Sequence, residues 1–394
     1  MNNHSIAAMI TVMLKELRDL FRDKRTIRIA LIMGPLFTPL LMLGVLTMAQ
    51  NRVSSQLEKP LELPVVGAQY APNLVAWLGG QNVDVLPAPT DADAAIRGQD
   101  RDVILAIGKD YPENWRNGMP AKVEIIHDTS RQDAAIPVER VEDLLRAYGS
   151  TVGSLRLVAR GVSPAVATPV IVAHRDLATP ESKRGLTLFF LPYMLILSGF
   201  LGGAHLVIDA TAGERERQSL EPLLATPSAR AAIMSGKIAA ACAFGMLSLL
   251  LTLIAFKLTF QFAPHLGIKL DVSILTMLKL LVVMLPVVVL GITLLTLIAA
   301  GAKSVKEAQS YMSVLMLLPL IPTIVLMINP IKNQLWQFAV PFLAQNQLIM
   351  KLLRMETVSP AEWGIYLLAG FGLGALLWAI ASRLYHREKL AISA

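Results

Sequence analysis

The sequence is poor in cysteine, in charge and in the motifs of soluble enzymes. Its 394 residues include one cysteine, Cys242, so no disulfide can form within the chain. Only 16% of the residues are charged, against about a quarter in soluble globular proteins. The sequence has no G-x-x-x-x-G-K-[ST] loop, the ordinary phosphate cradle of an ATPase. These shortages exclude a disulfide framework and argue against a soluble, ATP-hydrolysing enzyme.

Long uncharged runs stand where the charge is missing. Six runs of at least 19 residues contain no Asp, Glu, Lys or Arg, and a helix needs about 20 residues to cross a bilayer. Because backbone groups in lipid must pair within their own segment, these runs predict helices rather than open strands. The predicted transmembrane helices cover residues 30–49, 185–208, 238–256, 280–302, 308–331 and 363–382.

The distribution of charge predicts the orientation of these helices. Residues 50–184 hold 15 basic and 17 acidic residues, which leaves 21 basic and 12 acidic residues for the rest. Basic residues gather before the first span and after the second, fourth and sixth, so the positive-inside rule makes these segments and both termini cytoplasmic. Residues 50–184 are then external. No basic stripe with stacking aromatics is present, so we expect no nucleic-acid partner.

The external segment is predicted to be a compact α/β domain. Short apolar strands at 63–68, 83–88, 102–108 and 121–128 alternate with helical patterns, and a long helical pattern covers 133–160. His127 and Asp128 are neighbours on a strand and point to opposite faces, so we expect no catalytic or metal site there. The predicted fold class is an α-helical polytopic membrane protein with six transmembrane helices and an external α/β domain between the first two.

Residues 1–29 are predicted to form a cytoplasmic amphipathic interfacial helix before the first span. The pattern over 5–28 places apolar residues on one face and basic residues on the remainder. Such a helix lies in the headgroup layer and contacts membrane lipid; a simple cytosolic extension of the first span is the alternative. The apolar face comprises Ile10, Met13, Leu14, Leu17, Leu20 and Phe21.

Residues 209–234 form a predicted cytoplasmic loop of mixed charge. Residues 213–225 read as a helix with Glu214 and Glu216 in its first turn, where the helix dipole favours acids. A helix that only sat on the anionic leaflet would be basic on its polar face. Charges of both signs beside leucines suit a protein partner, where complementary potentials set the register. A stiff connector is the alternative.

The remaining residues, 235–394, are predicted to hold spans three to six and a short cytoplasmic tail. Residues 333–350 lack acidic and basic side chains before Lys351 but carry six Asn and Gln residues. This composition favours a re-entrant or interfacial segment on the outer side. Gly199, Gly202 and Gly203 in the second span favour close helix packing, with a flexible gate as the alternative. His205 and Asp209 share a face at the inner end of that span, where an interface role competes with an ion site.

Two stretches of sequence resemble a known family. Residues 213–237, GERERQSLEPLLATPSARAAIMSGK, are similar to the cytoplasmic loop of permease subunits of ABC-2 type exporters. Residues 15–26, KELRDLFRDKRT, resemble their N-terminal interfacial helix. Six spans with a large external domain between the first two resemble the sodium-export permeases of the NatB group.

The resemblance implies a mechanism and partners. The loop becomes a coupling helix that inserts into a separate, NatA-like ABC ATPase, present in two copies, which holds ATP and Mg²⁺. A second permease copy completes a homodimer in the bacterial cytoplasmic (inner) membrane. This chain then carries no cofactor, metal or catalytic residue of its own. The docking residues carried over are Glu214, Arg215, Glu216, Arg217, Leu220, Glu221, Leu223 and Leu224.

The expected function is therefore that of the permease subunit of an ATP-driven exporter. The resemblance favours Na⁺ as the substrate; drugs, lipids or peptides are the alternatives, and no substrate-binding residue is identified. A membrane sensor with an external ligand-binding domain is a different class, which four further spans and the lack of an output domain oppose. A membrane enzyme would need a Ser-His-Asp set or an H-E-x-x-H motif, and a gradient-driven transporter would need intramembrane charges.

Overall fold

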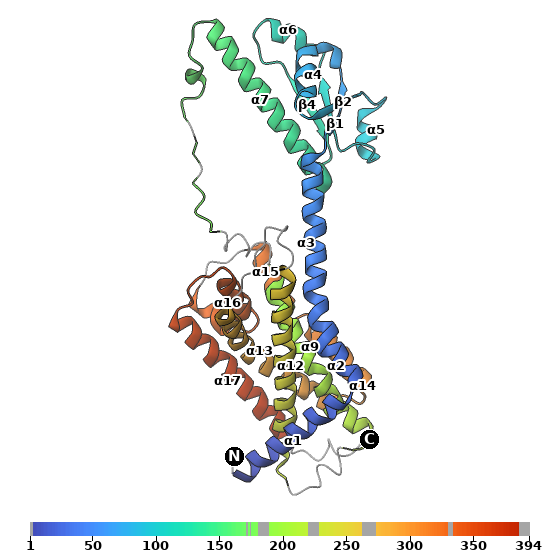
Figure 1. Ribbon diagram of the computed structural model, residues 1–394, viewed down its shortest axis with the longest axis vertical. Helices are drawn as coiled ribbons and strands as arrows, with labels where there is room; N and C mark the ends of the chain where they lie inside the picture. The colour runs from blue at the N-terminus through green and yellow to red at the C-terminus, as the bar shows by residue number, and fades with distance from the viewer. Residues whose placement is uncertain are drawn as a thin grey trace. The chain divides into compact units, whose positions relative to one another are not determined.

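The computed structural model in Figure 1 describes residues 3–170, 172–173, 175–179, 189–219, 228–261, 273–329 and 334–385. The chain divides into two compact units. The first, the helical unit, comprises Met1–Val45 and Leu177–Ala394, and the second, the α/β unit, comprises Leu46–Asp176. The chain passes from one to the other within helix α3 (Gly34–Glu58).

Six stretches of the described residues are helical, long and apolar enough to cross a membrane. This finding confirms the predicted number of spans and a multi-pass membrane protein. Uninterrupted stretches of charge-poor sequence explain why sequence alone located them. The candidate spans are Lys24–Glu58, Leu191–Glu216, Arg230–Gln261, Ile274–Gly301, Val305–Ile328 and Pro360–Arg383.

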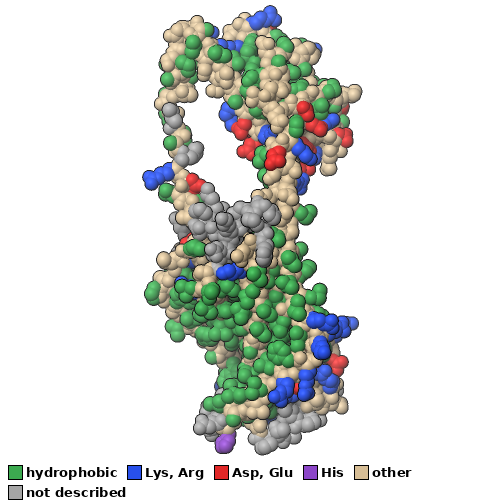
Figure 2. All heavy atoms as spheres, in the orientation of Figure 1, with side chains coloured by type: hydrophobic (Ala, Val, Ile, Leu, Met, Phe, Trp, Pro, Cys, Tyr) green, Lys and Arg blue, Asp and Glu red, His purple; other side chains and the backbone are tan. Residues whose placement is uncertain are grey.

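Three helices form the core of the helical unit: α9 (Leu191–Ile208), α12 (Arg230–Gln261) and α13 (Ile274–Gly301). In their spans 67%, 61% and 61% of the most apolar window is buried, against 17% in each of the other three. The mostly exposed spans carry large apolar side chains on their surface. Figure 2 shows hydrophobic side chains over the visible face of this unit, with basic side chains gathered toward one end.

Small residues let α9 and α12 approach to backbone contact. A Cβ on Gly203 would lie 2.5 Å from the carbonyl oxygen of Ala241, and one on Gly245 would lie 2.5 Å from that of Gly199. Atoms this close cannot accommodate a side chain, so glycine is required on both helices. The predicted packing role of these glycines is confirmed, as expected for helices that associate in lipid through small residues.

The fifth span is two helices rather than one. α14 (Val305–Leu315) and α15 (Leu320–Ile328) are joined by a turn at 316–319, and Pro319 stands directly before α15. The continuous helix expected over 308–331 is therefore wrong at this turn, since proline cannot donate the backbone hydrogen bond of a continuing helix.

Polar residues after the fifth span lie inside the protein. The described part contains the 3-10 helix η7 (Leu335–Ala339) and helix α16 (Leu343–Leu353), followed by α17 (Pro360–Tyr385). Gln345 Nε2 donates to Tyr366 Oη at 3.1 Å, and Asn346 Nδ2 donates to Thr323 Oγ1 at 2.9 Å. These bonds explain how amides tolerate burial. The re-entrant position of the segment stays a prediction.

The N-terminal helix is interrupted before the first span. α1 (Asn3–Arg22) ends at Asp23, whose Oδ1 accepts bonds from the backbone N–H groups of Arg25 and Thr26 at 3.0 and 3.3 Å and so caps α2 (Lys24–Ile27). A π-helical turn, η1 (Arg28–Met33), then leads into α3. The single helix expected over 5–28 is wrong at Asp23, because an aspartate that bonds the following N–H groups starts a new helix.

The α/β unit contains a four-stranded sheet of order β2-β1-β3-β4. β1 (Leu61–Val66) pairs in parallel with β2 (Val83–Pro87) and β3 (Val103–Ile107), and β4 (Val123–His127) is antiparallel to β3. The helices are α4 (Pro72–Gly79), α5 (Ala92–Arg97), α6 (Tyr111–Arg116) and α7 (Ala135–Ala159). Each predicted strand and helix is confirmed to within a few residues.

Candidate functional site

The segment after α9 changes its helical geometry and then stops. α9 runs into a π-helical turn, η5 (Asp209–Gly213), and a short helix, α10 (Glu214–Glu216). Gln218 has a φ of 57°, the left-handed conformation that ends a helix. The continuous helix expected over 213–225 is therefore wrong at Gln218. The predicted docking residues Leu220, Glu221, Leu223 and Leu224 lie outside the described residues, so their role stays a prediction.

A cluster of four charged residues lies where α10 meets α1 and α12; we call Lys15, Glu16, Glu214 and Lys237 the charged junction. Lys237 is 2% exposed and Glu214 8% exposed, and they form an ion pair. Lys237 Nζ also donates to the carbonyl oxygen of Ala210 at 2.6 Å. Buried charges are tolerated only when they are paired and hydrogen-bonded. This pair therefore fixes α10 against α12.

Lys15 joins α1 to the same cluster. Its Nζ lies 3.0 Å from Glu16 Oε1 and 3.7 Å from Glu214 Oε1. Burial alone would lower the pKa of the Lys15 ammonium, but the hydrogen bond and charge of Glu16, with the charges of Glu214 and Asp19, outweigh it and raise that pKa. Lys15 therefore stays protonated, and it holds α1 to α10 by charge.

The two residues after Glu214, Arg215 and Glu216, contact two further helices. Arg215 Nη1 donates to the carbonyl oxygens of Ala300 and Ala302 at 3.2 and 3.3 Å, at the C-terminal end of α13. Glu216 Oε2 accepts from the backbone N–H of Val305 at 3.0 Å, at the start of α14. Helix ends offer these unpaired groups and favour charges of these signs. A helix of three residues is thus bonded to α1, α12, α13 and α14.

A polar cavity of about 430 Å³ lies beside this arrangement. It is lined by residues of α1, α2, α9, η5 and α14, among them Glu16, Asp19, His205 and Asp209. Arg217 Nη2 pairs with Asp209 Oδ1 across its wall at 2.9 Å. His205 and Asp209, which the sequence placed on one face, both reach this cavity. Among the residues that the structure describes, no group of three or more His, Cys, Asp or Glu side chains could hold a metal ion.

The predicted interfacial helix packs with one side on α12. A Cβ on Gly236 of α12 would lie 2.7 Å from the carbonyl oxygen of Met9, so α1 crosses α12 at that glycine. Phe21 contacts Phe244 edge to face, with ring centroids 6.2 Å apart. These contacts make α1 a part of the helical unit rather than a free extension.

The apolar residues predicted for the face of α1 divide into two sets. Met13, Leu17 and Leu20 are half-buried, whereas Leu14 and Phe21 are 57% and 49% exposed. Together with the exposed Ile6 and Ile10, Leu14 continues an apolar stripe with a spacing of four residues. Contact of that stripe with lipid stays a prediction.

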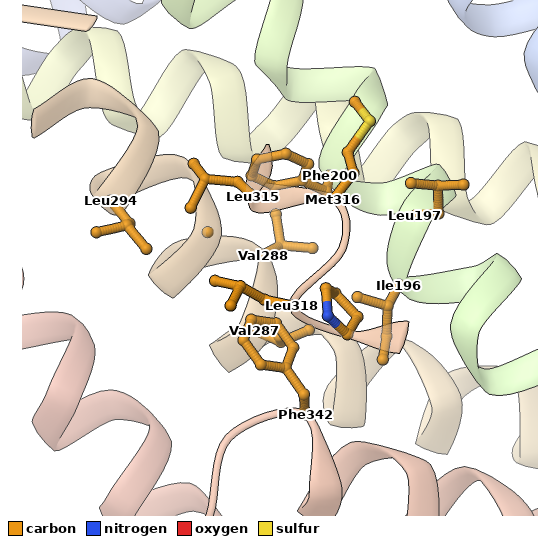
Figure 3. Close-up of a pocket in the computed structure, with 12 residues that line it drawn as sticks. Ile196, Leu197, Phe200, Val287, Val288, Leu294, Leu315, Met316, Leu318 and Phe342 are labelled. Atoms are coloured by element: carbon orange, nitrogen blue, oxygen red, sulfur yellow. The ribbon is translucent and has the colours of Figure 1, made fainter. Parts of the chain in front are cut away.

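A small apolar cavity of about 20 Å³ lies at the break in the fifth span. Figure 3 shows Phe200 of α9, Val287 of α13, Leu318 of the turn and Phe342 around it. A cavity of this size holds about one water molecule, far less than the roughly 300 Å³ of a small ligand site. In this conformation the cavity marks loose packing at the turn rather than a substrate site.

Sequence reasoning missed Glu16 and Lys237, which complete the charged junction. Lys237 stands directly before the uncharged run of the third span, and Glu16 is the one acidic residue among the first 18. Charged side chains at the edge of an apolar helix are energetically costly unless they are paired. This cost indicates from the sequence alone that such residues have partners. The contacts of Glu214 could not be derived, because its partners Lys237 and Lys15 lie 23 and about 200 residues away from it in the chain.

Comparison with known proteins supplies independent information. A family model described as ABC-2 family transporter protein matches residues 25–383. The protein named ABC transporter permease protein NatB, from Bacillus subtilis (strain 168), is 27% identical over 265 residues, which cover 64% of this chain and 67% of that protein. No solved structure matches.

Proposed function

Since the chain belongs to the ABC-2 family of transporter proteins, we propose that it is the permease subunit of an ATP-driven exporter in a bacterial inner membrane. A separate NatA-like ABC ATPase, in two copies, binds ATP and Mg²⁺ and hydrolyses the nucleotide. Two copies of this chain form the membrane part, with both termini cytoplasmic and residues 50–184 external. The name of the Bacillus relative, an ABC transporter permease, supports this assignment.

One observation carries the coupling mechanism: the bonding of α10 to α1, α12, α13 and α14. α10 is continuous with α9 through the π-helical turn η5 and forms the last turn of the span Leu191–Glu216, and it is also bonded to four other helices. Its position is therefore set by the bonded helices, and a force applied to it reaches all of them. A partner that pushes on the loop would move several spans at once.

The eight docking residues then divide into two roles. One role is to fix this segment in the helical unit, because each of four residues bonds to another part of that unit: Glu214, Arg215, Glu216 and Arg217. Leu220, Leu223 and Leu224, with Glu221, enter the cleft of the ATPase. Apolar anchors beside a complementary charge are the residues from which protein interfaces take most of their binding energy.

We propose Na⁺ as the exported substrate, on the resemblance to the sodium-export group. Drugs, lipids and peptides are the cargo classes against which it must be tested. Proteoliposomes that contain the chain and its ATPase, with ATP on the side of the ATPase, should move Na⁺ against its gradient. Movement of a hydrophobic dye in place of Na⁺ would assign the drug class instead.

The coupling role is tested by replacing Leu220 and Leu223 together with alanine. We expect transport to fall by about tenfold, the effect of removing an interface anchor, while insertion and amount of protein stay unchanged. The matched control is Leu155→Ala, a leucine 64% exposed in the α/β unit, which should leave transport unaltered. Full transport by the double variant, or full transport with no ATPase present, would refute the proposal.

A further inference from the structure

The α/β unit contains a cavity that transport coupling does not use. Its volume is about 310 Å³, at the lower end of the range of small-molecule sites, roughly 300–1,000 Å³. Residues of α4, α6, β4 and α7, labelled in Figure 1, line it together with the 118–121 connection. The cavity opens to the surface of the unit, so a small molecule can reach it.

One wall of this cavity, the aromatic wall, is formed by Tyr111, Trp115 and Tyr148. The rings of Tyr111 and Trp115 stack with centroids 5.6 Å apart and planes 17° from parallel. Trp115 and Tyr148 stack at 5.8 Å and 16°. Leu74, Val123 and Leu145 supply apolar surface beside them. A planar apolar molecule gains both area and stacking against such a surface.

Positive charge lies at one edge of the same cavity. The Arg156 guanidinium is 4.5 Å from the centroid of the Trp115 ring, and its Nη2 donates to the carbonyl oxygen of Trp115 at 2.9 Å. That bond uses one of several N–H donors. Arg160 Nη2 lies 3.1 Å from the point where a Cβ on Gly118 would stand. None of the described lining residues is acidic, so this edge favours an anion.

Two glycines keep the side along α7 open. Gly149 and Gly153 line the cavity, and a Cβ on either would have no atom within 4 Å. Each costs a helix interior about 1 kcal/mol relative to alanine. No close contact demands glycine at these two positions, in contrast to the glycines between α9 and α12. Their effect is to leave room beside the aromatic wall.

We propose that this cavity binds a planar, apolar molecule that carries one anionic group. The ring system lies against Tyr111, Trp115 and Tyr148, and the carboxylate, sulfonate or phosphate reaches Arg156 and Arg160. The site belongs to the α/β unit alone and does not depend on coupling to an ATPase.

The test measures binding of naphthoate to the purified full chain in lipid nanodiscs by calorimetry. Naphthoate joins a flat apolar ring to a carboxylate, naphthalenemethanol is its neutral counterpart, and naphthalenemethylamine its cationic one. We expect naphthoate to bind at least about tenfold more tightly than the other two, the effect of one charge-assisted contact. Equal binding of the three probes would overturn the anionic part of the proposal.

Two variants at Gly153 locate the binding. Gly153→Leu fills the open side of the cavity and should weaken naphthoate binding by about tenfold or more, whereas Gly153→Ala should retain it. Both variants favour the helix, so loss of folding does not explain a difference between them. Arg156→Gln should remove the preference for the anion. Unchanged naphthoate affinity in Gly153→Leu would show binding to lipid or elsewhere and would overturn the proposal.

Discussion

Replacing Glu214 by glutamine should destabilise the helical unit strongly. Its carboxylate pairs with Lys237, which is 2% exposed, so the variant removes the charge partner of a buried ammonium and leaves that ammonium its hydrogen bond to the carbonyl oxygen of Ala210. Breaking a buried pair by removing one partner costs about 3–5 kcal/mol. We take the lower figure, about 3 kcal/mol, because the Ala210 bond survives. At about 2–4 °C per kcal/mol for a unit of this size, the thermal midpoint should fall by roughly 6–12 °C.

The chain carries a built-in reporter for this measurement. Cys242 is its one cysteine and is buried in α12, close in sequence to Lys237. A maleimide dye that fluoresces on reaction with a thiol will label Cys242 only when α12 unpacks. The labelling midpoint in a temperature ramp therefore reports unfolding of the helical core. Wild type and variants are compared in the same detergent and at the same heating rate.

Two further variants separate pairing from packing. Lys237→Met should cost less than Glu214→Gln, because Glu214 keeps Lys15 at 3.7 Å. The double variant Glu214→Gln/Lys237→Met should regain most of the loss, since replacing both members of a buried pair is often neutral. A shift under about 2 °C in Glu214→Gln, or a double variant no more stable than that single one, would refute the reasoning.

Three other predictions follow from described contacts. Gly203→Val should prevent stable packing, because its Cβ would stand 2.5 Å from the carbonyl oxygen of Ala241; size-exclusion chromatography should show aggregation, whereas a monodisperse peak would contradict it. Glu216→Ala should lower the Cys242 labelling midpoint by only about 2–4 °C, since an exposed cap on the Val305 N–H is worth about 1 kcal/mol. Burial, then the charge of a neighbouring tyrosine, raises the pKa of Tyr111 from 10.0 to about 12. Its folded pKa exceeds its unfolded one, so the stabilisation is complete below pH 10 and is lost as pH rises to about 12; the ultraviolet phenolate difference between wild type and Tyr111→Phe should titrate there, and titration near pH 10 would contradict burial.

Hydrophobic period and length predicted most of the fold. Each strand of the α/β unit is a short apolar run between turn residues, and β3 (Val103–Ile107) is almost wholly buried, as its continuous apolar sequence requires. The spans follow from uncharged runs longer than a bilayer is thick. These signals are local, so they can be recognised without knowing which segments of the chain contact one another.

The predictions that were wrong or missing depend on contacts between residues distant in sequence or on single capping residues. Asp23 ends one helix and starts another through two backbone bonds, although the apolar pattern continues past it. Gln218 adopts a left-handed conformation that its side chain does not demand. The charged junction requires knowing that α1 crosses α12 at Gly236, which no local period specifies.

The glycine contacts between α9 and α12 limit how the helical unit can deform. Where one backbone touches another, a sideways displacement of either helix meets hard repulsion within a fraction of an ångström. α9 and α12 therefore move together as one rigid body. Bending of the helical unit is then expected at the turn at 316–319, where the fifth span is already divided and the surrounding side chains are loosely packed. A force applied at α10 should therefore tilt α9 and α12 together and bend the fifth span at the turn that already divides it.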